Sequence, residues 1–381
     1  MTLLTRRSAR AAIAILIVLM MLGFAPHAAE ADGHEGPTVV ATGLDQPRDI
    51  AFNDRGELFI SEAGSGGPDE VGFFAGSLQC SGLTGAVTRV DKAGNQRRVV
   101  EGLPSVADCV DGSGAAGPAG LIPRGRHTIF IQIGSTGTID PNSGVAAAGV
   151  DQFGRLLRTR PNGTVIGPVA DITSFEAATD TDGEGYDSNP TDVAAWGRNY
   201  VITDAGANAV HVISRSGRLI RTVEVPQEPC PGNPGNCFGD PTLDSVPTGI
   251  ARGSGDIFYI STLSGVVADF SVDPPDIGFK PGNGKVFAFD ARTGAIWPVV
   301  DDLFTAIDVA YDNRAGTIYV AEFLSGAVWA VDAESGDRSR VDTPGDLALP
   351  GGLAVDRNGN VYVSTFTAAP GMLGQVVRYD R

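Results

Sequence analysis

One short pattern recurs six times along the chain, and it constrains the fold more than any other feature. Each copy is a turn followed by a triplet of residues with an aromatic ring in the middle. The six central aromatics are Phe59, Phe130, Tyr200, Tyr259, Tyr319 and Tyr362. A second apolar segment lies shortly upstream of each triplet, as in Pro47–Phe52, and a third lies downstream, as in residues 85–90. Such units are typical of the four-stranded antiparallel blades of a β-propeller.

The end of the chain suggests how such a ring would close. The sixth copy stops at Arg381, directly after its third segment, and has no fourth. Residues 38–44 resemble the fourth segment of the first copy, residues 98–103. A first strand that completes the last sheet would leave no exposed edge between them. The predicted fold is therefore an all-β, six-bladed β-propeller closed by an N-terminal strand, in one domain over residues 32–381.

Residues 1–31 have the parts of a secretory signal peptide. Three arginines (Arg6, Arg7 and Arg10) precede an apolar run over residues 11–25, and Ala29-Glu30-Ala31 fits a cleavage site between small residues. The apolar run is shorter than the roughly 20 residues that span a bilayer, so cleavage is favoured over anchoring. We therefore expect a secreted protein, either extracellular or periplasmic.

The cysteines agree with export. All four lie beyond the signal region, and an even number in an oxidising compartment indicates two disulfides. Cys230 and Cys237 flank a short Pro/Gly-rich loop and are expected to pair. That pairing leaves Cys80 with Cys109.

The net charge limits the classes of partner. The formal charge is −17 at pH 7. An acidic surface repels phosphate backbones and anionic lipids, so neither nucleic acid nor a membrane is an expected partner of the processed chain. We expect a monomer that binds an unidentified small molecule or protein.

The long connections are predicted to share one face of the ring. Because successive strands run antiparallel, the connections from second to third strand and from fourth to next first strand lie on the same side. The long ones are residues 64–84, 104–117, 135–153, 173–189, 226–246 and 264–283. Elaborated loops on a rigid scaffold usually carry binding. The alternative is that these loops merely cap the channel.

Acidic residues gather at the same predicted face. The second strands end there with Glu62, Asp204 and Glu322. The first strands begin there near Arg48, Asp192 and Asp308. We expect these residues to line a ligand-binding site.

Residues 180–185 resemble the start of a calcium loop. Asp180, Asp182 and Glu184 alternate with small residues, and oxygen ligands at alternate positions suit Ca²⁺. No glutamate follows where an EF-hand loop has its bidentate ligand. The segment is therefore either a calcium site or a solvated acidic loop.

Catalytic patterns are missing from the sequence. Beyond the signal region the histidines are His34, His127 and His211, and none neighbours a candidate nucleophile. There is no Gly-x-Ser-x-Gly elbow, P-loop or dinucleotide-binding glycine motif. No catalytic residue is assigned.

Several segments resemble the ScyD/ScyE family, exported propeller proteins named from scytonemin-type gene clusters. They are residues 43–52, 58–64, 83–90, 170–176, 187–190, 200–208 and 245–249. The resemblance implies a six-bladed fold and export, but no settled activity. It marks Arg48, Glu62, Glu176, Asn189, Asp204 and Asn208 as candidate binding residues. The sequence departs from the family pattern over residues 262–269, which puts a shared ligand contact there in doubt.

Two functions are consistent with these observations. The first is a secreted, non-catalytic binding protein that holds a small molecule, a cation or a protein partner on its acidic face. The alternative is a calcium-dependent lactonase- or esterase-like hydrolase resembling gluconolactonase-type propellers, with Glu62 and Asp204 near the ion. A quinone-dependent sugar dehydrogenase is less favoured, because such sites use a histidine base.

Overall fold

A computed structural model describes most of the chain beyond the signal region. It covers residues 36–381 except 75, 126–127, 136–146, 161, 233, 238–239, 270, 273–275, 342–346 and 370. The predicted signal peptide, His34 and His127 lie outside the described residues.

The described residues form an all-β protein, as predicted, in which six antiparallel sheets have four or more strands each. The first sheet contains β2 (Pro47–Phe52), β3 (Leu58–Glu62), β5 (Ser77–Val90) and β6 (Gln96–Asp108), with β4 (Asp69–Phe74) paired to β5. The second contains β7 (Pro118–Arg124), β8 (Thr128–Ile133), β9 (Arg155–Thr159) and β10 (Val165–Asp171). The third contains β11 (Pro190–Trp196), β12 (Asn199–Asp204), β13 (Ala209–Ile213) and β14 (Leu219–Glu224).

The remaining sheets follow the same order. The fourth contains β17 (Pro247–Arg252), β18 (Ile257–Thr262), β21 (Gly284–Asp290) and β22 (Ile296–Leu303). The fifth contains β23 (Ala306–Asp312), β24 (Thr317–Glu322), β25 (Val328–Asp332) and β26 (Arg338–Arg340). The sixth contains β27 (Leu353–Val355), β28 (Val361–Thr365), β29 (Gly374–Tyr379) and, at its edge, β1 (Thr38–Leu44).

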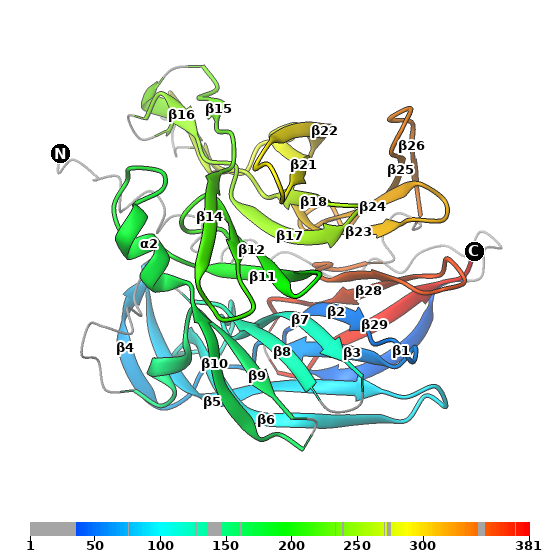
Figure 1. Cartoon of the computed structure of the whole chain (residues 1–381). Helices are drawn as coiled ribbons and strands as arrows, with labels where there is room; N and C mark the ends of the chain where they lie inside the picture. The colour runs from blue at the N-terminus through cyan, green and yellow to red at the C-terminus, as the bar shows by residue number, and fades with distance from the viewer. Residues whose placement is uncertain are drawn as a thin grey trace.

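The first strands of the sheets contact one another in sequence. Strand β2 contacts β7, β7 contacts β11, β11 contacts β17, β17 contacts β23, β23 contacts β27, and β27 contacts β2 again. Strand β1 pairs antiparallel with β29, with Thr38 opposite Arg378, so blue β1 and red β29 lie side by side in Figure 1. This is the arrangement of sheets in a β-propeller.

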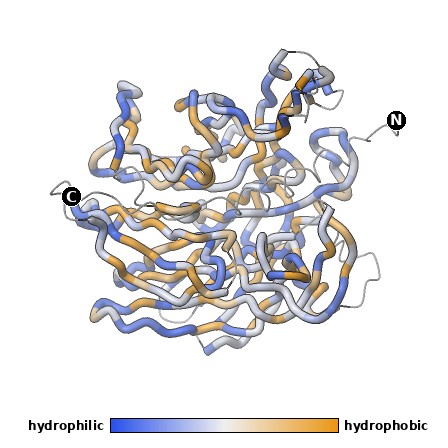
Figure 2. The backbone as a smooth tube through the Cα atoms, turned by 180° about the vertical axis from the view of Figure 1, so that it is seen from behind, coloured by the Kyte–Doolittle hydropathy of each residue, from blue (hydrophilic) through white to orange (hydrophobic). Residues whose placement is uncertain are grey.

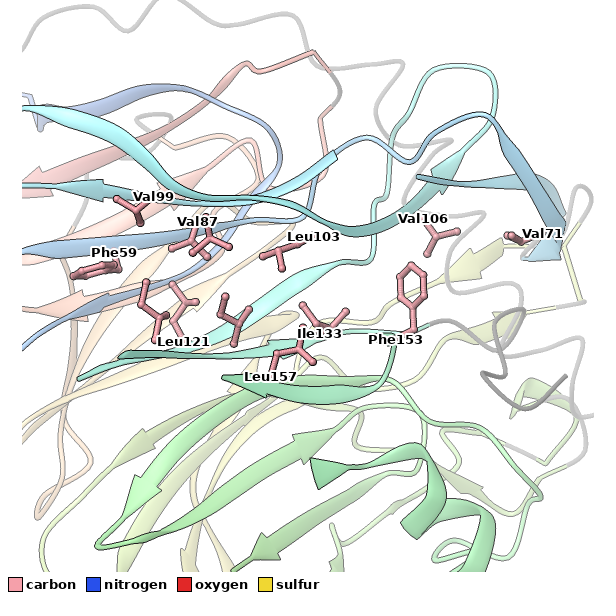
Figure 3. Packing of buried hydrophobic residues seen from close by; sticks show 13 residues of the cluster. Phe59, Val71, Val87, Val99, Leu103, Val106, Leu121, Ile133, Phe153 and Leu157 are labelled. Atoms are coloured by element: carbon pink, nitrogen blue, oxygen red, sulfur yellow. The ribbon is translucent and has the colours of Figure 1, made fainter. Parts of the chain in front are cut away.

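Packing between neighbouring sheets explains why the strands are apolar on successive residues. Each of the six sheets has a neighbouring sheet on both of its faces. Polar and apolar residues therefore alternate only weakly along its inner strands. Side chains of the first and second sheets point toward one another in Figure 3, among them Val87, Leu103, Leu121, Ile133 and Leu157. Figure 2 shows how hydropathy is distributed along the backbone: hydrophobic stretches follow the strands, and hydrophilic stretches lie at many peripheral turns.

Some segments expected as loops contain regular structure. Within residues 64–84, β4 pairs with the outer part of β5, so this insertion is a hairpin extension of the first sheet. Two small sheets lie in other insertions: β15 (Glu228–Pro229) with β16 (Thr242–Leu243), and β19 (Val267–Asp269) with β20 (Asp276–Gly278). The helical elements are α2 (Thr173–Thr179), η2 (Val150–Gln152) and η3 (Pro234–Cys237).

Both predicted disulfides are confirmed. Cys80 bonds to Cys109, with a Cα–Cα distance of 4.9 Å, and Cys230 bonds to Cys237, with a Cα–Cα distance of 5.9 Å. The first joins β5 to the residue after β6, and the second closes the loop between β15 and η3. Two disulfides suit an oxidising environment. Within the described range, no helix has the length and apolar character needed to cross a bilayer.

Candidate ligand-binding cavity

A cavity of about 510 Å³ lies where the first strands of the six sheets begin. Six lining residues, which we call the floor, hold equivalent places at the start of a first strand or just before it: Arg48, Ala119, Thr191, Thr248, Ile307 and Gly351. Residues from five of the six long connections also line the cavity, namely 64–84, 104–117, 173–189, 226–246 and 264–283. The walls include the apolar side chains of Phe74, Val246, Leu263, Phe279 and Phe323. The cavity is therefore a largely apolar hollow that is open to solvent on one side and lined by residues in or next to the six sheets.

The next residue along each of these segments alternates between aspartate and glycine. The first, third and fifth sheets supply Asp49, Asp192 and Asp308, and the second, fourth and sixth supply Gly120, Gly249 and Gly352. All three aspartates line the cavity.

Each of these carboxylates joins its own sheet to the next one. Oδ2 of Asp49 accepts the backbone N–H of Leu121 at 2.7 Å. Oδ2 of Asp192 accepts that of Ile250 at 2.8 Å. Oδ2 of Asp308 accepts that of Leu353 at 2.6 Å. The aspartates thus link first strands in pairs around the cavity.

The glycines leave room on the other side of each aspartate. An alanine Cβ at Gly120 would lie 2.5 Å from Oδ1 of Asp192, and one at Gly249 would lie closer still to Oδ1 of Asp308. One at Gly352 would lie 2.8 Å from Cα of Asp49. Contacts this short do not occur without displacement of the neighbour, so aspartate on one sheet requires glycine on the preceding sheet.

Burial changes the pKa of the charged groups around the cavity. It raises the pKa of Asp49 from an ordinary value of 3.8 to about 7. Burial, together with repulsion from Asp49, raises the pKa of Asp192 and of Asp308 well above the usual range, and Asp308 adds to the effect at Asp192. Burial also lowers the pKa of Arg48 to about 10.

Glu62, predicted for the binding face, lies inside the first sheet and is fully buried. Oε2 accepts the backbone N–H of Asp45 at 2.8 Å, and Oε1 accepts the hydroxyl of Thr88 at 2.6 Å. The guanidinium of Arg98 donates to both oxygens, from Nε to Oε1 at 3.0 Å and from Nη2 to Oε2 at 2.5 Å. Glu62 is not among the residues that line the cavity.

Asp204 and Glu322 occupy equivalent places in the third and fifth sheets. Asp204 accepts the hydroxyl of Ser188 at 2.6 Å and the backbone N–H of Asn189 at 2.7 Å. Oε1 of Glu322 accepts the backbone N–H of Phe304 at 2.8 Å. Both side chains hold the segment that leads into their own first strand, and neither lines the cavity.

The two asparagines marked by the family resemblance have different positions. Asn189 lines the cavity, and its Oδ1 accepts the backbone N–H of Ser135 at 3.1 Å. Asn208 is fully buried. Its Oδ1 accepts the backbone N–H of Val246, a wall residue, at 3.1 Å, so Asn208 supports the cavity from behind.

Glu176, Asp180 and Asp182 form an acidic cluster at α2 and the turn after it. One carboxylate oxygen from each lies within 4.8 Å of the others, a spacing that could hold a metal ion. Sequence reasoning grouped Asp180 and Asp182 with Glu184, whereas the structure groups them with Glu176. The segment that follows the cluster carries Asp187 and Asn189, which line the cavity.

Of the predicted binding residues, the cavity brings together Arg48, Asn189, Asp192 and Asp308. Sequence reasoning missed Asp49, the third member of the aspartate set. An alignment of the six first strands would have found it, because that alignment places Asp49, Asp192 and Asp308 in one column with the three glycines.

Comparison with known proteins gives structural likeness alone. No family model matches the sequence, and no curated protein matches it. A solved streptogramin B lyase is 12% identical, with a TM-score of 0.48, over 90% of this chain and 95% of that chain. Virginiamycin B lyase from Staphylococcus aureus is 10% identical, with a TM-score of 0.47, over 90% and 87%. The PQQ-bound aldose sugar dehydrogenase from Streptomyces coelicolor is 14% identical, with a TM-score of 0.48, over 92% and 99%.

These likenesses are too low to say anything about the site. The sheets and the cavity define an all-β protein of the β-propeller class, with a hollow near the starts of the first strands.

Proposed function

We propose that this chain is an exported binding protein that holds a small molecule in the cavity at the end of the ring. The observation that carries the proposal is the cavity itself. Its volume of about 510 Å³ falls in the range of roughly 300–1,000 Å³ typical of small-molecule sites, and residues in or next to every sheet line it. The predicted signal peptide and the two disulfides support export, and the resemblance to the ScyD/ScyE family is part of the same proposal.

The chemistry of the lining favours a ligand with an apolar body and a cationic amine. Aromatic side chains such as Phe279 and Phe323 would cover the apolar body. Among the described lining residues, Arg48 is the one basic side chain, against six aspartates: Asp49, Asp108, Asp187, Asp192, Asp244 and Asp308. A bound cation would offset the repulsion between the desolvated carboxylates.

No observation in the described residues specifically supports the hydrolase alternative. It requires carboxylate or amide oxygens that converge on one point, with Glu62 and Asp204 among them. In the described residues both side chains accept internal hydrogen bonds outside the cavity lining. We therefore propose binding without turnover.

Titration calorimetry with a pair of opposite-charge probes tests this proposal. We expect phenethylamine to bind and 3-phenylpropionate, a similar ring with the opposite charge, not to bind. Ala119→Phe fills the floor of the cavity and is expected to weaken amine binding by about tenfold or more, which corresponds to about 1.4 kcal/mol. The matched control, Ile220→Phe, adds a ring to β14 at a side chain that is half exposed and away from the cavity lining.

Two results would contradict the proposal. One is a carboxylate that binds as well as the amine does, or an amine that does not bind. The other is amine binding that survives Ala119→Phe unchanged while the variant melts as a folded protein.

A further inference from the structure

The acidic cluster has one feature that its surface charge does not explain. Glu176 belongs to α2 and is fully buried, with 0% of its surface exposed. Its Oε2 accepts the backbone N–H of Thr181 at 3.4 Å, a long contact. Its Oε1 is buried and has no hydrogen-bond partner. A buried carboxylate oxygen without a hydrogen-bond donor destabilises the folded state, because it loses its hydrogen bonds to water and forms none within the protein.

The surroundings of Glu176 add further negative charge. Burial, together with repulsion from Asp204 and Asp182, raises the pKa of Glu176 to about 7. Glu224 also lies close enough to Asp182 to be repelled by it. Within the part of the chain that the structure describes, no basic group is among the neighbours that affect the pKa of Glu176 or Glu224.

The geometry matches what an oxygen-bound divalent cation requires. Ca²⁺ binds oxygens at about 2.3–2.6 Å, so two oxygens on one ion lie at most about 5 Å apart. One oxygen from each of Glu176, Asp180 and Asp182 lies within 4.8 Å of the other two. Backbone donors already fix the turn: the N–H of Gly185 donates to Oδ1 of Asp180 at 2.8 Å, and that of Glu184 donates to Oδ1 of Asp182 at 3.0 Å.

We propose that Glu176, Asp180 and Asp182 form a calcium site that fixes the segment leading to the cavity residues Asp187 and Asn189. The buried Oε1 of Glu176 is the inner ligand, and the two aspartates complete the charged side of the site. Water and backbone carbonyls supply the remaining oxygens that Ca²⁺ needs. The site lies outside the cavity lining, so calcium binding does not depend on the cavity ligand proposed above.

Calorimetric titration of the processed chain with CaCl₂ alone, after treatment with EDTA, tests the proposal. We expect one ion per chain, with a dissociation constant in the range of about 0.1–1 mM typical of extracellular calcium modules. Glu176→Gln, Asp180→Asn and Asp182→Asn are each expected to weaken binding by about tenfold or more, because affinity follows the number of charged ligands. The matched control is Glu184→Gln, from the same loop, which is expected to change affinity by less than about twofold.

The outcomes distinguish a calcium site from an acidic turn that holds no ion. Calcium binding lost in the three ligand variants and kept in Glu184→Gln supports the proposal. The absence of calcium binding, or an equal loss in Glu184→Gln, overturns it. Glu176 is buried, so Glu176→Gln could fail to fold. In that case Asp180→Asn decides whether the cluster binds calcium, because the Asp180 side chain is exposed and its replacement should leave the fold intact. Amine binding is measured separately with phenethylamine, so failure of one proposal does not imply failure of the other.

Discussion

At the residue scale, two opposing effects act on the ionisation of the aspartates around the cavity. Each accepts a backbone N–H from the next sheet, as Asp49 does from Leu121, and each lies in a desolvated setting with two other carboxylates. The hydrogen bonds favour the ionised form, whereas burial and mutual repulsion favour the protonated form. Because burial is the largest effect, the stability of the protein should depend on pH through these groups.

The direction of this dependence follows from the pKa of Asp49. It is about 7 in the folded protein, above the ordinary value of 3.8 expected in the unfolded chain. The folded state therefore binds the Asp49 proton more tightly than the unfolded state does. The stabilisation from this proton is complete below the unfolded-state pKa of 3.8, and it is lost as the pH rises through about 7. We expect the free energy of unfolding of the wild type to fall between about pH 4.5 and about pH 7.5 more than that of Asp49→Asn.

Urea unfolding at both pH values measures this difference, with Asp54→Asn as the control. Asp54 is exposed in the turn between β2 and β3, so its variant should follow the wild type. Parallel pH profiles for wild type and Asp49→Asn would show that this carboxylate does not carry the effect.

At the element scale, the ion pair between Arg98 and Glu62 ties β6 to β3 across the intervening β5. Glu62 has 0% of its side chain exposed, and Arg98 has 31%. Replacing Arg98 leaves a buried charge that still accepts two other hydrogen bonds, so the loss is less than for an isolated buried ion. We expect Arg98→Met to lower the free energy of unfolding by about 2 kcal/mol.

The neighbouring arginine on the same strand provides the control. Arg97 is exposed, and a surface substitution of this kind changes stability by about 0.5 kcal/mol or less. Urea denaturation of Arg98→Met and Arg97→Met should separate the two. If the two variants lower the free energy of unfolding equally, the ion pair between Arg98 and Glu62 does not stabilise the first sheet.

The same elements show what sequence could and could not predict. The aromatic triplets predicted β3, β8, β12, β18, β24 and β28, because a strand covered on both faces has to be apolar on successive residues. Strand β4 was missed, since its pairing depends on how far β5 continues outward. Glu62, Asp204 and Glu322 lie near the predicted end of their strands, but the direction of a side chain at a strand end depends on the tertiary partners it finds. Glu176 was not grouped with Asp180 and Asp182 because the sequence did not predict α2, the short helix that brings Glu176 next to the acidic turn.

At the scale of the whole molecule, the cavity exists only because the sheets meet around a common axis. Its floor takes one residue from the start of each first strand or from just before it, and the sixth sheet gains its outer strand from the other end of the described chain. The pairing of β1 with β29 therefore holds the first and last sheets in register, and with them Asp49 and Gly352, whose backbones lie in contact.

Cross-linking of β1 to β29 tests this arrangement most directly. Thr38 lies opposite Arg378, and directly opposed residues of antiparallel strands have Cα atoms about 4.5–5.5 Å apart, within the range of a disulfide. All cysteines in the described residues are already paired, so an added pair should react with each other. The control pairs Thr38→Cys with Arg338→Cys, an exposed position on β26 of the fifth sheet. We expect mass spectrometry to find a disulfide in the Thr38→Cys/Arg378→Cys variant and none in the control. No link between positions 38 and 378, or equal linking in both variants, would contradict the predicted closure of the ring by β1.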